Sequence, residues 1–119
     1  MLEPIAPLVA RRKARRAGER RAEVRHPCNL NVAFRPLAKR HDEFRVARAL
    51  DISMGGIGLF VEEEVRPGTI LAVELLHRGR SQRMLLARVA HTAAYGEAAY
   101  LLGCEFASGL SPDDLQALL

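Results

Sequence analysis

The sequence contains few aromatic residues, few cysteines and no long apolar segment. It has no tryptophan, and aromatic residues make up 5% of its 119 residues. Single-stranded nucleic acids are usually bound on exposed aromatic side chains that stack with the bases, so this shortage argues against nucleic acid as a partner. No stretch approaches the roughly 20 apolar residues of a membrane helix, and residues 1–10 lack the features of a signal peptide. We therefore expect a cytoplasmic protein with no membrane partner.

Residues that build metal centres or nucleophilic sites are also scarce. The two cysteines, Cys28 and Cys104, have no second pair and no neighbouring histidine pattern, so we expect buried free thiols rather than a disulfide. The four histidines are scattered, and none has the spacing of a metal ligand or of a base beside a nucleophile. The acidic run 62–64 enters a Pro-Gly turn, as a solvated strand edge does. The sequence thus argues against an enzyme, a metal or a cofactor.

The chain has the composition of one globular domain, but its charge is uneven. Hydrophobic residues make up 49% and charged residues 27%, which suffices for a single core. Residues 1–25 contain eight basic and three acidic residues, against ten and eleven in the rest. We assign residues 1–19 to a basic N-terminal arm with a short polar helix over 7–20, flexible until an anionic ligand binds.

Beyond Pro27 the hydrophobic pattern takes the two-residue period of half-buried strands. Leu30, Val32 and Phe34 alternate with polar neighbours, which predicts the first strand. Five further runs with turn residues between them predict strands at 44–52, 57–61, 70–76, 84–93 and 100–106. Six short strands with tight turns are typical of a closed antiparallel barrel. Ser111 and the proline after it predict a C-terminal helix, with the leucines at 115, 118 and 119 packed on the barrel.

Two short motifs lie beside the first two predicted strands. Arg21-x-x-x-Arg25 precedes the first strand and can present two guanidinium groups to one ligand. Alone it is a weak signal, because the same spacing recurs in the Arg-rich arm and suits a solvated basic face. Asp51-x-Ser53-x-x-Gly56 is rarer, although a plain turn would also produce it if Asp51 capped backbone N–H groups and the glycines took positive φ angles.

Together and in this order, the two motifs resemble the signature of the PilZ domain, a small bacterial β-barrel that binds the second messenger cyclic di-GMP. The run Leu-Gly-Cys-Glu-Phe at 102–106 is similar to the closing strand of that family. The resemblance implies that residues 20–119 form an all-β, six-stranded antiparallel barrel with a short C-terminal helix. It also implies a ligand site made of Arg20, Arg21, Arg25, Asp51, Ser53, Gly55 and Gly56. In the family, the residue at the position of Arg20 influences ligand number, which implies two stacked molecules here.

The chemistry of these residue types suits cyclic di-GMP, which carries two phosphates and two guanine bases. A guanidinium group can bond to guanine O6 and N7 or to a phosphate, and it can stack on a base. The carboxylate of Asp51 can accept hydrogen bonds from the N1–H and N2 amino groups of guanine. Ser53 can add a hydroxyl contact, while Gly55 and Gly56 let the backbone approach the ligand closely.

The sequence therefore predicts a signalling receptor whose arm closes over the ligand and which acts on a downstream effector protein. Two alternatives stay open. A small basic barrel that binds RNA or single-stranded DNA would explain the charge of the arm. A PilZ-like adaptor that works only through protein contacts would keep the fold without the ligand.

Overall fold

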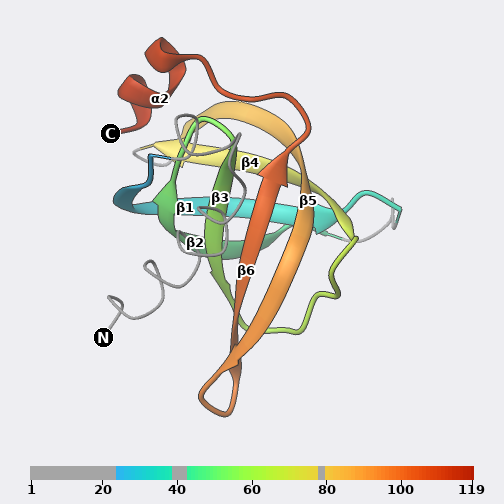
Figure 1. The fold of residues 1–119 in the computed structure, drawn as a ribbon. Coiled ribbons are helices and arrows are strands. Elements are labelled where there is room, and N and C mark those ends of the chain that lie inside the picture. Colours follow the sequence, from blue (N-terminus) through green and yellow to red (C-terminus); the bar gives the residue numbers. More distant parts are fainter. Residues whose placement is uncertain (1–23, 39–42, 78–79) are drawn as a thin grey trace.

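The computed structural model describes residues 24–38, 43–77 and 80–119, which form a six-stranded barrel with a C-terminal helix (Figure 1). The predicted arm at 1–19, its helix at 7–20, and the site residues Arg20 and Arg21 lie outside the described residues. The division into arm and barrel domain therefore stays a prediction. The described elements are β1 His26–Pro36, β2 Arg45–Ile52, β3 Gly56–Val61, β4 Ile70–His77, β5 Arg80–Tyr95, β6 Ala99–Phe106 and α2 Pro112–Leu118.

The strands are neighbours in the order β1, β2, β3, β6, β5, β4, and β4 pairs with β1 to close the barrel. Every neighbouring pair is antiparallel. Closure leaves none of these strands with an unpaired edge. The predicted fold class is confirmed.

Several strands extend beyond their predicted bounds, β5 furthest, because partner strands supply hydrogen bonds where the hydrophobic pattern fades. β1 begins at His26, and the next residue, Pro27, pairs with Asp51 beside a bulge that precedes Leu30. A proline is tolerated there because the bulge interrupts the ladder of hydrogen bonds. β5 runs on to Tyr95, which pairs with Ala99 across the hairpin to β6.

The core occupies the interior of the barrel and consists of the alternate residues that the pattern assigned to one face. Val32 and Phe34 point inward from β1, and both are buried as predicted. The largest fully buried apolar side chains are Phe34, Ile52, Ile57, Leu59, Leu71, Leu75 and Leu102. Burial of each such side chain contributes about 1.5–3 kcal/mol to folding.

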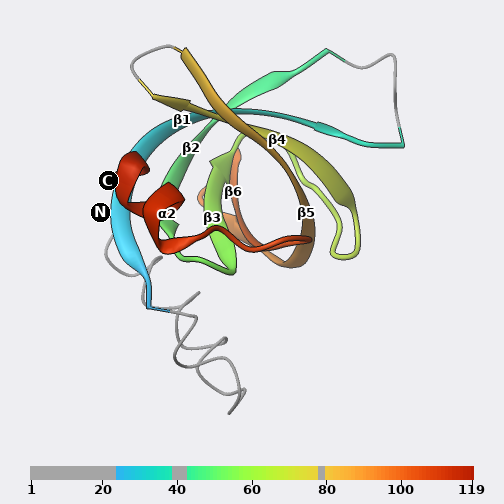
Figure 2. The same cartoon turned by 90° about the horizontal axis from the view of Figure 1, so that it is seen from above.

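Helix α2 lies at one end of the barrel (Figures 1 and 2). Its start is the predicted one, since the side chain of Ser111 accepts a hydrogen bond from the backbone N–H of Asp114 at 3.0 Å. Leu115 and Leu118 are buried in the core as predicted. Leu119 is 50% exposed, so its predicted packing is wrong; it follows the last helical residue and leaves the buried face.

Cys28 and Cys104 form no disulfide bond, as predicted. Cys104 is fully buried, but Cys28 is only half-buried, because it lies next to the bulge in β1. Among the described residues, no helix has the length and apolar character needed to cross a membrane.

Candidate ligand-binding site

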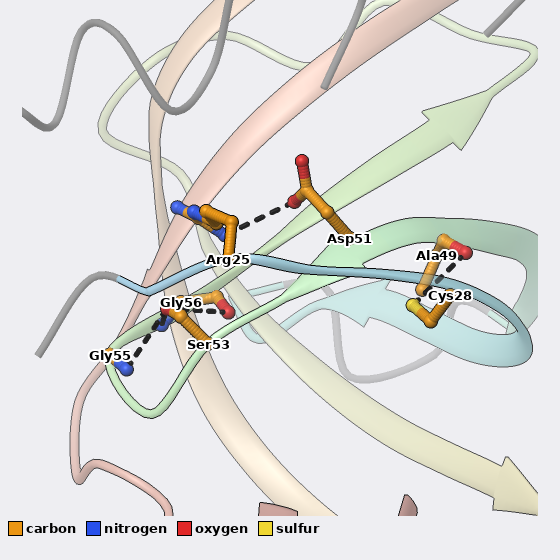
Figure 3. A network of polar contacts seen from close by, with 7 residues as sticks. All are labelled: Arg25, Cys28, Ala49, Asp51, Ser53, Gly55 and Gly56. Atoms are coloured by element: carbon orange, nitrogen blue, oxygen red, sulfur yellow. Dashed lines mark hydrogen bonds and ion pairs between the residues drawn. The ribbon is translucent and has the colours of Figure 1, made fainter. Parts of the chain in front are cut away.

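The described part of the predicted site gathers where β1 begins and β2 ends (Figure 3). Arg25 lies immediately before β1, and Asp51 lies at the end of β2. Ser53 follows β2 in the bend that leads to Gly56, the first residue of β3. The register of β1 against β2 places Pro27 opposite Asp51, which brings the two sequence motifs together although they are 26 residues apart.

Arg25 and Asp51 form a buried ion pair. Nη1 of Arg25 donates a hydrogen bond to Oδ1 of Asp51 at 3.2 Å, and the two side chains are 6% and 1% exposed. A charge in such a place is retained only when an opposite charge or hydrogen bonds compensate for its lost hydration. Removal of one partner from a buried pair typically destabilises a protein by about 3–5 kcal/mol. This pair therefore holds the start of β1 against the end of β2.

The bend between β2 and β3 is closed by the side chain of Ser53. Its Oγ accepts hydrogen bonds from the backbone N–H groups of Gly55 and Gly56, at 3.2 and 3.1 Å. Its backbone N–H donates to the carbonyl of Gly56 at 2.9 Å. The positive-φ glycines among the described residues are Gly68 and Gly96, so a bend based on positive φ at Gly55 or Gly56 is wrong. The Ser53 hydroxyl, fully buried, shapes this bend instead.

The same bend is hydrogen-bonded to the segment that leads from β6 into α2. The backbone N–H of Phe106 donates to the carbonyl of Gly55 at 2.9 Å, and that of Leu110 donates to the carbonyl of Met54 at 2.8 Å. Met54 also borders a cavity of about 240 Å³ shared by Val24, the start of β1 and helix α2. Movement of the bend would therefore change the contacts of α2 and of the segment that leads into it.

Two glycines lie between Asp51 and a histidine in a row that crosses four strands. Asp51 is opposite Gly58 on β3, Gly58 is opposite Gly103 on β6, and Gly103 is opposite His91 on β5. A Cβ atom at Gly58 would lie 2.7 Å from Oδ1 of Asp51, and one at Gly103 would collide with the imidazole of His91. Both side chains thus extend over a glycine.

Sequence reasoning did not single out Gly58 or His91, and it gave Gly103 no role beyond the resemblance of its strand. An isolated glycine inside a strand is the one signal that was available, since it often marks a close approach of another group. The sequence around His91 contains no pattern that would place it beside the site. Its place beside the site depends on the pairing of β5 with β6 and on the bulge between Val89 and His91.

Cys28 lies near this site, but its thiol is not suited to nucleophilic chemistry. Burial, with a further contribution from the negative charge of Asp51, raises the pKa of the Cys28 thiol to about 11. Its Sγ donates to the carbonyl of Ala49 at 3.5 Å. The thiol is therefore protonated near neutral pH, when a reactive cysteine would be a thiolate.

The family model of the PilZ domain matches residues 19–119. The fold is similar to that of the Bacillus subtilis inhibitor of motility MotI (DgrA), with a TM-score of 0.60 and 21% identity over 81% of this chain. It is also similar to K. pneumonia MrkH in its apo state, with a TM-score of 0.58 and 19% identity over 78%. A further MrkH structure, reported as a c-di-GMP-dependent transcription regulatory factor, gives a TM-score of 0.55 and 17% identity over 79%.

These alignments cover 46%, 44% and 46% of the three solved chains, so this chain spans less than half the length of each. At such identities the likeness shows the fold. No protein of curated function matches the sequence.

The close contact of Asp51 with Gly58 predicts an asymmetry between the two glycines of the row. Gly58→Ala should lower the free energy of unfolding by about 1–3 kcal/mol, because its methyl group must displace a carboxylate that the buried Arg25 holds in place. Gly103→Ala is the matched control and should cost less, because the group it meets is the end of the flexible, half-buried side chain of His91 rather than a carboxylate held by a buried ion pair. Urea unfolding of both variants checks this; equal losses would contradict the proposed rigidity of Asp51.

Proposed function

This chain belongs to the PilZ domain family, and from that premise we propose that it is a receptor for cyclic di-GMP and not an enzyme. The observation that carries the proposal is the buried Arg25–Asp51 ion pair beside the Ser53 bend. It places one cation and one anion of the two sequence motifs within 3.2 Å of each other. Cyclic di-GMP offers partners for both, since its phosphates are anionic and its guanine bases carry donors and acceptors.

In this proposal Asp51 accepts hydrogen bonds from the N1–H and N2 amino groups of one guanine base. Arg25 holds the carboxylate in place before the ligand arrives, and then bonds to a phosphate or stacks on a base. Both side chains are almost fully buried, so the segment that carries Arg25 must shift for a ligand to reach them. Ligand binding is therefore coupled to a conformational change in the segment that carries Arg25.

The bend contributes to binding mainly through its backbone. Because the hydroxyl of Ser53 is occupied by the N–H groups of Gly55 and Gly56, we assign Ser53 a positioning role within the site. Gly55 and Gly56 then present backbone without side chains to the ligand. Arg20 and Arg21 complete the site in this proposal, and Arg20 favours two stacked ligand molecules, as the family resemblance implies.

The signal would leave the site through helix α2. The carbonyl groups of Met54 and Gly55 hold the backbone of Leu110 and Phe106, which lead directly into α2. A ligand that moves the bend will change these hydrogen bonds and the cavity that Met54 shares with the helix. We propose that the altered surface around α2 is what a downstream effector protein binds.

Isothermal titration with cyclic di-GMP tests the receptor function, with GTP and a short RNA as competitors at physiological salt. We expect selective binding of two ligands per chain. Arg25→Ala should weaken binding about ten- to a hundredfold, because it removes charge-assisted contacts of about 1.5–3 kcal/mol. Arg21→Ala should do the same. Arg25→Lys should also weaken binding, since it keeps the charge but lacks the planar fork.

Arg45→Ala is the matched control for these variants. Arg45 lies at the far end of β2 and pairs with Glu63 at 2.9 Å with both side chains exposed, so its loss should leave affinity unchanged. Thermal unfolding shows whether each variant is folded. An absence of binding by the folded wild-type chain would exclude the receptor function and favour an adaptor. One ligand per chain would exclude only the role given to Arg20.

Amide hydrogen exchange tests the route through α2. Cyclic di-GMP should change the exchange rates of Phe106 and Leu110, whose N–H groups bond to the bend, and of Leu115, whose N–H bonds to Ser111. Amides between β4 and β5 serve as the internal control and should not change. If the ligand binds and the rates change in the bend alone, the proposed route is wrong.

A further inference from the structure

A second surface, remote from the Arg25–Asp51 pair, is unusually apolar. It is the outward side of the neighbouring strands β2, β1, β4 and β5, together with the residues that flank them. Among the described residues, six of the eight large apolar side chains that are exposed belong to it: Leu37 (39%), Phe44 (40%), Val46 (74%), Ile70 (38%), Met84 (52%) and Leu86 (41%). We call this surface the outer apolar face.

The strand register shows that these side chains are neighbours. One row across the sheet is Val46, Ala33, Glu74 and Met84. Val46 and Met84 are exposed and Glu74 is half-buried, whereas the small side chain of Ala33 is buried. The adjacent row contains Arg35, Ala72 and Leu86. Phe44 lies against the guanidinium group of Arg35, 5.2 Å from its ring centre.

Leu37 and Ile70 continue the outer apolar face at its edge, where the N–H of Leu37 donates to the carbonyl of Ile70 at 2.8 Å. Monomeric soluble proteins rarely expose a contiguous apolar surface of this kind, and such surfaces usually mark interaction sites.

Two exposed cations, Arg48 on β2 and Arg88 on β5, also lie on the outward side of these strands, and Arg88 pairs with Glu105. A further cation and a further anion on this face do not pair with each other. Arg35 and Glu74 are half-buried on adjacent strands, and within the described residues neither forms an ion pair. Nη1 of Arg35 is buried and has no hydrogen-bond partner there. A buried donor of this kind destabilises the protein if it stays unsatisfied. Both groups would gain from an opposite charge that approaches from outside the chain.

We propose that the outer apolar face is the interface of a symmetric homodimer. In a two-fold contact the same surface meets itself, so a surface with both Arg35 and Glu74 can place each opposite the other residue of the second copy. The interface then contains two ion pairs surrounded by apolar contacts. A partner of one charge sign would satisfy only one of the two groups, which is why a second copy fits this surface better.

The geometry of the barrel also suits face-to-face packing. The closed barrel has no free strand edge, so two copies would associate through sheet faces, as the layers of a β-sandwich do. A stable interface needs about 800 Å² per partner, which is about a tenth of the 7371 Å² surface of this chain. The outer apolar face spans four of the six strands. It uses the Val46 end of β2, whereas the ligand site uses the Asp51 end, so dimerisation goes beyond the proposed function and leaves the ligand site free.

Sedimentation equilibrium of the full chain, with and without charge reversals, tests the dimer. The wild-type chain should be dimeric at about 100 µM. Arg35→Glu and Glu74→Arg should each weaken dimerisation at least about tenfold, because like charges then face each other twice. An equimolar mixture of the two variants should recover the wild-type affinity, since the mixed dimer again contains two opposite-charge pairs.

Two further variants complete the experiment. Glu97→Arg makes the same charge change in the exposed β5–β6 hairpin and should leave the dimer unchanged. Val46→Glu, at a position 74% exposed, should be monomeric yet folded by circular dichroism. A monomeric wild-type chain would overturn the proposal. So would a dimer that the reversals leave intact, or a mixture of the two reversal variants that stays monomeric.

Discussion

The ion pair between Arg25 and Asp51 joins the two segments from which the ligand site is built. Each group is almost completely buried, so each depends on the other to compensate for lost hydration. The pair fixes the start of β1 against the end of β2, and the Ser53 bend follows directly from β2. A ligand that offers both phosphate and guanine donors can replace the interactions within this pair, which is the physical basis of the proposed switch.

The surroundings of Asp51 preserve this arrangement. Gly58 provides the space into which the carboxylate extends, and Gly103 does the same for His91. The Ser53 hydroxyl holds the bend, and the bend carbonyl groups hold the segment that leads to α2. The ion pair is thus joined to the segment that leads to α2 through the backbone between Asp51 and Ser53 and the hydrogen bonds of the bend.

Much of this arrangement could be predicted from local patterns, because the two-residue alternation reports burial directly. The alternation from Leu30 to Phe34 predicted strand β1, and the cap at Ser111 predicted helix α2. Both elements are observed. Two expectations were wrong, each for a physical reason. Gly55 and Gly56 were expected to supply positive φ angles as one explanation of the bend, whereas a side-chain hydrogen bond closes it. Leu119 was expected to pack, but the helix ends one residue before it.

The remaining features depend on strand pairing, which local sequence does not encode. The row from Asp51 to His91 requires the register of four strands and a bulge in β5. The outer apolar face likewise arises from β4 returning to β1, which brings Glu74 next to Ala33. Arg20 and Arg21 stay predictions, since they lie outside the described residues.

The carbon-13 resonance of the Asp51 carboxyl group, followed during titration with cyclic di-GMP, tests the role of the ion pair most directly. If Asp51 exchanges Arg25 for guanine donors, its resonance should move to a new position in proportion to the bound ligand, and the guanidinium resonances of Arg25 should move with it. If the ligand saturates the protein while both resonances stay where they are, the ion pair is a structural feature of the barrel and not the site of recognition.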